Sequence, residues 1–214
     1  MLEAKSAARR ELFAARRAMP GEARGHADLA TWKALRDFLI EAVDEGAVIA
    51  AYRPFGAEPG AALEPELPER LTVVYKVLLP VLLPDNDLAW QEAVPAGPQA
   101  ETGDERGRED PAGGEAGAAS DGSGPAGQAG PVLEPKTIER VAAVIVPGLA
   151  VSHDGIRLGR GGGSYDRALA RVGPQVPVVA LLRDGEFGVR VPAEPHDRPV
   201  TGVITPRTGF RSLR

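Results

Sequence analysis

The sequence contains no cysteine, and this absence excludes several classes of chemistry at once. A disulfide framework, a thiolate zinc site, an iron–sulfur cluster and a cysteine nucleophile all require that residue. Histidine is scarce as well, with only His26, His153 and His196 scattered along 214 residues, which argues against a histidine-rich transition-metal centre. Any metal ion is therefore expected to be hard and bound by oxygen atoms.

Long hydrophobic runs are also absent. The N-terminal segment MLEAKSAARRELFAARRAMP carries charges every few positions and no extended apolar run, so it does not resemble a secretory signal. No stretch approaches the roughly 18 consecutive apolar residues of a membrane span. We therefore expect a cytoplasmic protein that does not associate with a membrane.

The net charge is concentrated in one segment, residues 95–131. This segment holds seven acidic and two basic side chains, and removing them from the chain's 30 acidic and 25 basic residues leaves 23 of each. The rest of the chain is neutral, so its charge gives no support for nucleic-acid binding. The segment contains no Val, Ile, Leu, Met or aromatic residue, which predicts a disordered insertion within a single domain spanning 1–214. Such an insertion is tolerated when its two ends lie close together.

Helix-like and strand-like segments alternate along the remaining chain. Residues 3–18, 28–43 and 164–172 are predicted to be helices, the second with an apolar face of Leu29, Trp32, Leu35, Leu39 and Val43. Apolar runs predict buried strands at 47–52, 72–83 (in two pieces broken at Pro80), 141–149, 176–182 and 201–205. This order predicts an α/β fold: a mostly parallel open sheet with helices on both faces, in a three-layer Rossmann-like arrangement.

A glycine-rich segment between a predicted strand and a predicted helix carries the clearest functional signal. Its four glycines are Gly159, Gly161, Gly162 and Gly163. Glycine permits positive φ angles and close approach of the backbone to a ligand, and the following helix presents unpaired N–H groups. Arg157 and Arg160 add guanidinium groups suited to phosphate. The segment matches neither the P-loop nor the G-x-G-x-x-G pattern, and a flexible glycine turn is the alternative interpretation.

Two aspartates are candidate ligands for Mg²⁺. Asp166 lies just inside the predicted helix, where a carboxylate would bind a metal ion beside phosphates or simply cap the helix. Asp197 precedes the last predicted strand and would supply a second oxygen ligand, oriented by His196. The adjacent histidine and aspartate are a weak zinc signal, because two ligands of a zinc site are missing.

Three further positions are candidates for binding a ligand. Lys5 and Arg9 lie four residues apart, so they share one face of the first helix and either grip a polyphosphate or form part of a solvated surface. Glu58 follows the first strand, at the edge where open α/β sheets place ligands, although a lone loop glutamate is often only solvated. Trp90 either stacks on a planar ligand or fills the core, and the core is favoured.

Together these motifs resemble the 5-formyltetrahydrofolate cyclo-ligase family. The most specific part is VPGLAVSHDGIRLGRGGGSYDRAL, residues 146–169, which is similar to the family's glycine-rich signature. Lys5-x-x-x-Arg9, Glu58 and His196-Asp197 are three further matches in the same order. The resemblance covers most of the chain except 95–131.

The resemblance implies a reaction that converts ATP and 5-formyltetrahydrofolate into 5,10-methenyltetrahydrofolate, ADP and phosphate. A formamide oxygen is a poor leaving group, so its phosphorylation gives an imidoyl phosphate whose carbon the N10 amine attacks before phosphate departs. Such a reaction depends on positioning and on neutralisation of charge more than on a protein nucleophile. That requirement suits a chain without cysteine.

The resemblance also implies roles for individual residues. The ATP phosphates would be held by Lys5, Arg9, Arg157, Gly159, Arg160, Gly161, Gly162, Gly163, Ser164 and Tyr165, of which Arg160 and Tyr165 are also the candidate catalytic residues. Mg²⁺ would be held by Asp166 and Asp197, and the pterin by Glu58 with Phe55, Trp90 and Tyr165 as the wall of the folate site. The expected partners are small molecules, and the expected state is a monomer.

The chain departs from the family pattern at the glycine loop. Many family members carry a lysine at the middle of this loop and an aromatic residue two positions later, where this chain has Gly162 and Ser164. Either Arg160 replaces the missing cation or the backbone N–H groups suffice. The departure supports an alternative hypothesis, a non-catalytic α/β protein that binds a nucleotide or a phosphate metabolite. A dinucleotide oxidoreductase is disfavoured, because its fingerprint is missing.

Overall fold

The computed structural model describes residues 2–95, 130–194 and 197–213. Its helices are α1 (Leu2–Ala18), α2 (Gly21–Ala42), α3 (Leu67–Thr72), the 3-10 helix η1 (Pro135–Arg140) and α4 (Ser164–Leu169). Its strands are β1 (Val48–Ala50), β2 (Lys76–Leu82), β3 (Leu88–Glu92), β4 (Val132–Leu133), β5 (Ala143–Pro147), β6 (Ala150–Val151), β7 (Arg157–Leu158), β8 (Val178–Leu181), β9 (Gly202–Thr205) and β10 (Gly209–Ser212). Nearly all of the predicted insertion, and the prediction for His196, lie outside the described residues.

Eight of the strands form one mixed sheet in the order β10-β9-β8-β5-β1-β2-β3-β4. The five central strands, from β9 to β2, run parallel to one another, and β10, β3 and β4 are antiparallel to their neighbours. The predicted α/β fold with a mostly parallel sheet is thus confirmed. The antiparallel strands at its two edges were not predicted. β6 and β7 form a separate two-stranded sheet beyond β5.

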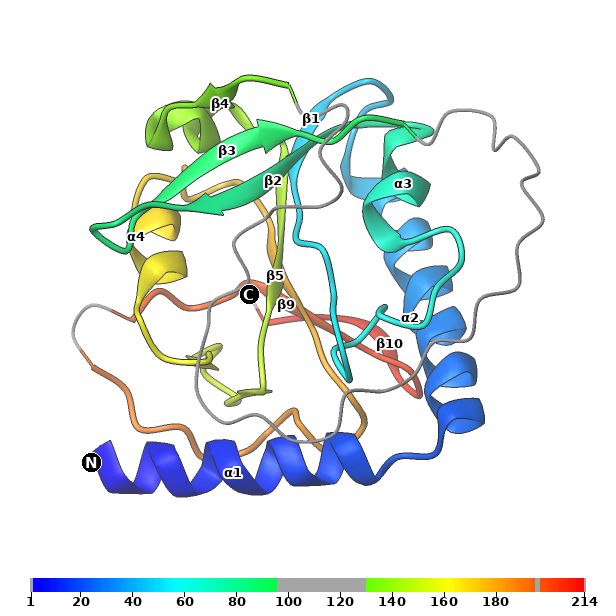
Figure 1. Cartoon of the computed structure of the whole chain (residues 1–214), viewed down its shortest axis with the longest axis vertical. Coiled ribbons are helices and arrows are strands. Elements are labelled where there is room, and N and C mark those ends of the chain that lie inside the picture. Colours follow the sequence, from blue (N-terminus) through cyan, green and yellow to red (C-terminus); the bar gives the residue numbers. More distant parts are fainter. Residues whose placement is uncertain (1, 96–129, 195–196, 214) are drawn as a thin grey trace, which may run out of the picture.

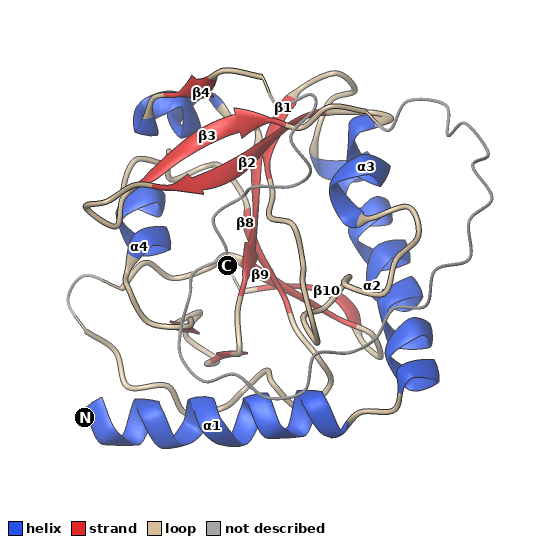
Figure 2. Cartoon of the chain, viewed as in Figure 1, coloured by secondary structure: helices blue, strands red, loops and turns tan. Residues whose placement is uncertain are grey.

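Two apolar clusters occupy the opposite faces of this sheet, because alternate strand residues point to opposite sides. One cluster packs against α2 and α3 and includes Ile49, Val77, Ile145, Val179 and Ile204. The other packs against α4 and η1 and includes Ala50, Leu78, Val144, Val146, Ala180 and Val203. Helices therefore cover both faces, in the predicted three layers (Figure 2).

The first helix, α1, lies across one end of the molecule instead of on a face of the sheet (Figure 1). Its apolar side chains, including Leu12 and Phe13, pack against a third cluster of Leu149, Ala150, Leu158 and Val191. These residues follow the carboxyl end of β5, so α1 closes that end of the sheet. The charged side of the helix is thereby brought next to the glycine-rich segment.

The strand predicted over 72–83 differs from the observed one in two ways. Its first residue, Thr72, ends helix α3, and β2 begins only at Lys76. The predicted break at Pro80 is wrong, because β2 continues through it and pairs Pro80 with Trp90 of β3. The carbonyl of Val77 accepts the N–H of Ala93, just after β3. Because successive residues face opposite sides, the backbone of Pro80 faces β1, whose pairing with β2 ends at Leu78. The missing N–H therefore removes no hydrogen bond between strands.

The second helix is longer than predicted and is buried differently at its start. It begins at Gly21 instead of Asp28, and Leu29 of its predicted apolar face is 54% exposed. Asp28 is buried instead, because its carboxylate accepts hydrogen bonds from the loop after β1, at Gly60 and Ala62. Within the described ranges, no helix is both long enough and apolar enough to traverse a bilayer.

The two flanks of the predicted insertion lie side by side. β3 pairs antiparallel with β4, with Trp90 opposite Leu133 and Gln91 opposite Val132. Gln91 Nε2 also donates to the carbonyl of Gly130 at 2.5 Å. The condition for tolerating a long insertion, that its ends be close, is met by this pairing.

Candidate functional site

The chain order of the parallel strands places a ligand site between β1 and β5. From β1 the chain continues to β2 on one side, whereas β5, β8 and β9 follow one another on the other side. At such a switch point the loops leaving the carboxyl ends of the two strands diverge and open a crevice. The loop after β1 carries Phe55 and Glu58, and the chain after β5 leads through the β6–β7 hairpin to the glycine loop, residues 159–163. The two predicted binding segments thus start from the strands that flank the switch point.

The glycine loop has the backbone conformation that its sequence predicted. Gly161, Gly162 and Gly163 have consecutive φ angles of 116°, 102° and 68°, which side-chain-bearing residues rarely adopt. Gly163 caps the N-terminus of α4, and Ser164 is the first residue of that helix. Arg9 of α1 donates from Nε to the carbonyl of Gly159 at 2.9 Å. The predicted cationic face of α1 therefore lies directly against the loop.

The guanidinium of Arg157 lies behind the glycine loop, and its predicted contact with phosphate stays a prediction. Its side chain is only 5% exposed, and it donates to the carbonyl of Pro147 and forms an ion pair with Asp166 at 3.4 Å. A Cβ atom at Gly159 would meet Arg157 Nη1 at 2.7 Å, so the guanidinium fills the space behind the loop. Arg157 therefore supports the loop from behind, where its contacts with Pro147 and Asp166 hold the guanidinium.

Arg160 connects the glycine loop to the loop after β1. Its Nη2 lies 3.0 Å from Oε1 of Glu58, and its guanidinium carbon lies 4.1 Å from the centroid of the Phe55 ring. Glu58 is buried, and its second oxygen accepts the backbone N–H of Phe55 at 3.1 Å. Burial raises the pKa of Glu58 above its ordinary value of 4.5, against the opposing effect of the Arg160 guanidinium. A carboxylate, a cation and an aromatic ring are thus held together at the switch point.

The hydroxyl of Tyr165 is buried without a hydrogen-bond partner in the described structure. Burial raises the pKa of Tyr165, so this hydroxyl stays protonated and is able to donate. The Tyr165 ring lies beside the guanidinium of Arg157, at 5.3 Å. An unpaired donor next to the glycine loop is a feature that a bound acceptor would satisfy.

Trp90 is buried in the core, so the structure gives no support to its predicted place in the wall of the folate site. It is 0% exposed within the cluster beneath α4 and η1, and its Nε1 donates to the carbonyl of Pro135 at 3.1 Å. The indole is the largest fully buried side chain among the described residues. Core packing, the favoured interpretation of this tryptophan, is the one observed.

The two predicted metal ligands lie on neighbouring backbone segments. Asp166 Oδ1 accepts the N–H of Arg198 at 3.3 Å, and Asp197 immediately precedes that residue. Asp197 Oδ2 lies 3.6 Å from Lys5 Nζ and accepts the N–H of Glu194 at 2.7 Å. The resulting series of contacts joins α1, the segment before β9 and the start of α4.

The donor set available for a metal ion is small. Within the described parts of the chain, no group of three or more histidine, aspartate or glutamate side chains is arranged to hold a metal ion. Mg²⁺ commonly binds one or two carboxylates and completes its shell with waters and substrate phosphates. The neighbouring Asp166 and Asp197 fit that kind of site, in which a nucleotide supplies the other oxygens.

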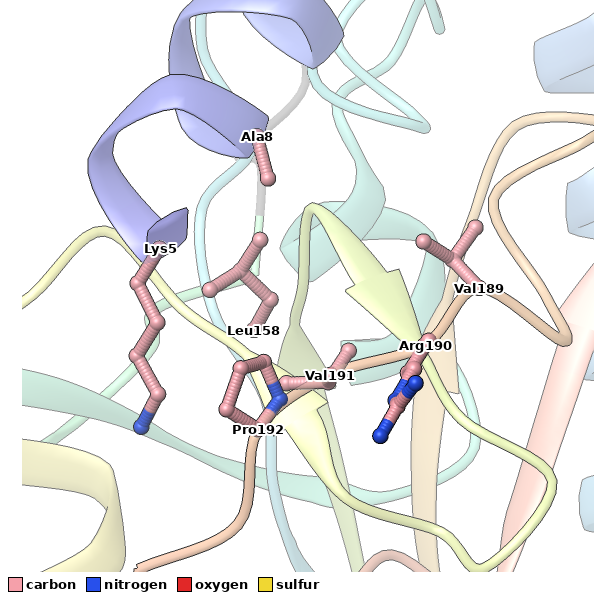
Figure 3. Close-up of a pocket in the computed structure, with 7 residues that line it drawn as sticks. All are labelled: Lys5, Ala8, Leu158, Val189, Arg190, Val191 and Pro192. Carbon is pink, nitrogen blue, oxygen red and sulfur yellow. The ribbon is translucent and has the colours of Figure 1, made fainter. Parts of the chain in front are cut away.

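A cavity of about 460 Å³ lies between α1 and the segment that precedes Glu194. Its walls are Lys5, Ala8, Leu158, Val189, Arg190, Val191 and Pro192. Figure 3 shows Lys5 and Arg190 on opposite sides of Leu158, Val191 and Pro192. Since Leu158 immediately precedes the glycine loop, the cavity adjoins that loop on the Lys5 side.

Two buried ion pairs near these loops were not predicted from the sequence. Arg16 of α1 pairs with Glu186, and Arg183 pairs with Asp28 of α2. The partners are 170 and 155 residues apart, so no local pattern signals them. The only available hint was a charged residue within an otherwise apolar segment, and such residues are also common on solvated helix faces.

Fold and site together define a class of protein: an α/β protein with a glycine-rich loop and an acidic loop opposed at the switch point of a mostly parallel sheet. Comparison with known proteins is more specific. The model of the 5-formyltetrahydrofolate cyclo-ligase family matches residues 1–206. A 5-formyltetrahydrofolate cyclo-ligase from Mycolicibacterium smegmatis is 36% identical over 217 residues, covering 98% of this chain and 97% of that protein. The chain belongs to the 5-formyltetrahydrofolate cyclo-ligase family.

Solved structures agree with this assignment. A 5,10-methenyltetrahydrofolate synthetase from Aquifex aeolicus is 26% identical, with a TM-score of 0.66 over 98% of this chain and 93% of its own. A synthetase of the same name from Mycoplasma pneumoniae has the same TM-score at 20% identity, over 95% of this chain and 99% of its own. The second likeness is evidence for the fold alone.

Proposed function

We propose that this protein catalyses the ATP-dependent cyclisation of 5-formyltetrahydrofolate to 5,10-methenyltetrahydrofolate, with release of ADP and phosphate. The observation that carries the proposal is the contact between Arg160 and Glu58 at the switch point. It joins a loop suited to phosphate to a buried carboxylate suited to the N–H groups of a pterin. Membership of the family supports the same reaction.

In the proposed reaction the γ-phosphoryl group of ATP is transferred to the formyl oxygen, and ADP leaves. The N10 amine then attacks the formyl carbon, loses its proton, and displaces phosphate to close the ring. Lys5, Arg9 and the backbone N–H groups of the glycine loop would hold the phosphates, with the nucleotide extending into the cavity beside Lys5. Arg160 would stabilise the charge that develops on the transferred group, as expected for electrostatic catalysis.

The folate would bind on the other side of Arg160. Glu58, as a carboxylate, accepts hydrogen bonds from the pterin, and the half-exposed Phe55 ring covers one face of it. The unpaired hydroxyl of Tyr165 would donate to a substrate oxygen. Each group is thus assigned a ligand that its charge and its hydrogen-bonding capacity fit.

Mg²⁺ belongs to the same proposal. Asp166 and Asp197 would hold the ion, which neutralises charge on the ATP phosphates. We also propose that the protein is a cytoplasmic monomer whose partners are small molecules and not nucleic acids or membranes.

The proposal is tested by incubating the protein with 5-formyltetrahydrofolate and MgATP while recording methenyl absorbance and ADP. Both products are expected to appear in equal amounts. The glycine and serine at 162 and 164 favour the alternative, a protein that binds a nucleotide without turnover. Calorimetric binding of ATP with no methenyl product would establish that alternative and overturn the enzymatic one.

A further inference from the structure

A buried carboxylate lies beneath the loop that carries Glu58. Asp28 of α2 is 0% exposed, and its two oxygens accept the backbone N–H groups of Gly60 at 2.8 Å and Ala62 at 2.9 Å. The first of these oxygens also pairs with Arg183. Burying a carboxylate is costly unless its oxygens accept a full set of hydrogen bonds. A buried ion pair is by itself weak evidence for stability. The main structural effect of the Asp28–Arg183 pair is to fix the backbone of the loop after β1.

Arg183 holds the same loop from its other side. This residue lies two positions after the end of β8 and is buried, and its Nη2 donates to the carbonyls of Glu58 at 2.9 Å and Ala57 at 3.4 Å. One end of the guanidinium therefore binds Asp28, and the other binds the backbone of the residue that would recognise the pterin. Two side chains from distant elements thus fix four backbone groups between residues 57 and 62.

We propose that Asp28 and Arg183 are positioning residues that place the Glu58 carboxylate for folate. The chain between β1 and α3 is long and irregular, so its own secondary structure does not determine where Glu58 lies. A carboxylate recognises a pterin only when it is placed to within a fraction of an ångström. The inference rests on the proposed function, because it takes Glu58 to be the folate-binding group.

The geometry separates the folate side from the phosphate side. The backbone N–H of Arg183 donates to Glu186 at 2.7 Å, and Glu186 binds Arg16 of α1 through both of its oxygens. Replacing the side chain of Arg183 leaves this backbone contact in place. Helix α1, with Lys5 and Arg9, should therefore keep its position, and an Arg183 variant should affect folate much more than ATP.

The decisive variant is Arg183→Lys, which keeps a cation for Asp28 but loses the second guanidinium nitrogen, the donor to the loop carbonyls. We expect KM for 5-formyltetrahydrofolate to rise about tenfold, with KM for ATP unchanged within about twofold. Asp28→Asn should have the same signature and should lower Tm as well, because it leaves Arg183 unpaired. Asp37→Asn, the same substitution at an exposed ion pair on the same helix, is the matched control and should change none of these values.

A double variant distinguishes positioning from general support of the fold. If Arg183 acts through Glu58, adding Arg183→Lys to Glu58→Gln should raise KM for folate no further. Any one of three results would overturn the inference. These are full additivity of the two substitutions, equal changes in both KM values, and a folate KM within twofold of wild type in Arg183→Lys. The proposed function fails by a different result, the absence of methenyl product from the wild-type protein. If Asp28→Asn does not fold, Arg183→Lys and the double variant still decide the question.

Discussion

The two loops that face each other at the switch point are held in opposite ways. Residues 160–162 of the glycine loop are exposed, and Gly161 and Gly162 have backbone angles accessible mainly to glycine. Side chains such as Arg9 hold the loop at its margin. Residues 58–60 of the opposite loop are buried, and the charged groups of Asp28 and Arg183 hold their backbone. The glycine loop presents its backbone to solvent. The opposite loop has a fixed backbone and presents the side chain of Glu58.

This difference matches the two ligands of the proposed reaction. A polyphosphate carries many equivalent acceptor oxygens, so exposed N–H groups and a few cations bind it without exact placement. A pterin offers donors in one fixed pattern, so its partner has to be placed in advance. The comparison predicts that substitutions on the phosphate side reduce activity mainly by removing charge or by straining the backbone. Substitutions on the folate side should reduce it mainly by displacing the Glu58 carboxylate.

The largest effect is expected from the proposed metal ligand beside the glycine loop. Asp166→Asn keeps an oxygen for the N–H of Arg198 but removes the negative charge. Turnover should fall at least about 100-fold, equivalent to roughly 2.7 kcal/mol, and Tm should fall as well, because the buried Arg157 loses its charged partner. The measurement is methenyl formation across a range of Mg²⁺ concentrations.

The control for Asp166→Asn is Asp85→Asn. Asp85 likewise accepts a backbone N–H, from Asp87, but in an exposed turn, and its replacement should leave turnover intact. Wild-type turnover in Asp166→Asn at every Mg²⁺ concentration would show that this carboxylate does not hold a metal ion needed for the reaction.

The second effect concerns backbone strain in the glycine loop. Gly162→Ala has room for its methyl group, whose nearest neighbour is Ser164 Oγ at 3.8 Å, so the change acts through the φ angle of 102°. Strain of roughly 1–3 kcal/mol is expected to distort the loop or shift its conformation. We expect kcat/KM for ATP to fall about tenfold, as measured by initial rates at saturating folate.

Gly46→Ala provides the matched comparison for this strain. Gly46 has a φ angle of 77°, no atom within 4 Å of an added Cβ, and a place in the turn before β1, away from the site. The same type of strain there should lower Tm without changing kcat/KM. An equal loss of kcat/KM in both variants would mean that the glycine loop has no special role.

The third effect is a pH dependence on the folate side. The folded protein holds the proton of Glu58 more tightly than the unfolded chain does, because burial raises the pKa of this carboxyl. The resulting stabilisation is fully present below about pH 4.5, the unfolded pKa, and is lost as the pH rises through the folded pKa. Glu58→Gln should abolish this loss, so the variant should gain stability relative to wild type as the pH rises through that window.

Thermal unfolding of both proteins over a series of pH values measures this difference. Glu134→Gln is the contrasting control, since Lys136 lowers the pKa of the exposed Glu134 and the sign of its contribution is reversed. The prediction fails if Glu58→Gln and wild type have parallel curves of Tm against pH. Weaker folate binding together with higher stability at neutral pH would show that the site sacrifices stability for recognition.

The central sheet was predictable because its strands are continuous apolar runs. The runs at 47–52, 141–149, 176–182 and 201–205 all contain strands of the parallel part. The antiparallel strand β3 was not predictable in the same way, because DLAWQEA has weak strand propensity and forms a strand by pairing with β2. Propensity acts locally, whereas edge strands depend on a neighbour that the local sequence does not specify.

The candidate site could be predicted from sequence where its residues lie in one segment. The glycine loop and Asp166 lie within eight residues of each other, so spacing alone brought them together. The buried pair of Asp28 and Arg183 joins residues 155 positions apart, and only the fold shows that both face the Glu58 loop. The position of Arg157 was not predictable for a similar reason, since a sequence does not reveal which side of a loop a guanidinium occupies.

The smallest effect is expected from deleting residues 97–129 and closing the gap with a short linker. The deletion keeps Gly130, which accepts from Gln91, and the direct pairing of β3 with β4. Shortening the connection should reduce the entropic cost of closing this loop on folding by at most about 2 kcal/mol, which is a slight gain in stability. Turnover and both KM values should stay within about twofold of wild type, because the two loops of the site leave the sheet from β1 and β5. A large rise in KM for one substrate alone would show that the deleted segment contributes to that side of the site, and the contrast between the two loops would then have to include a third element.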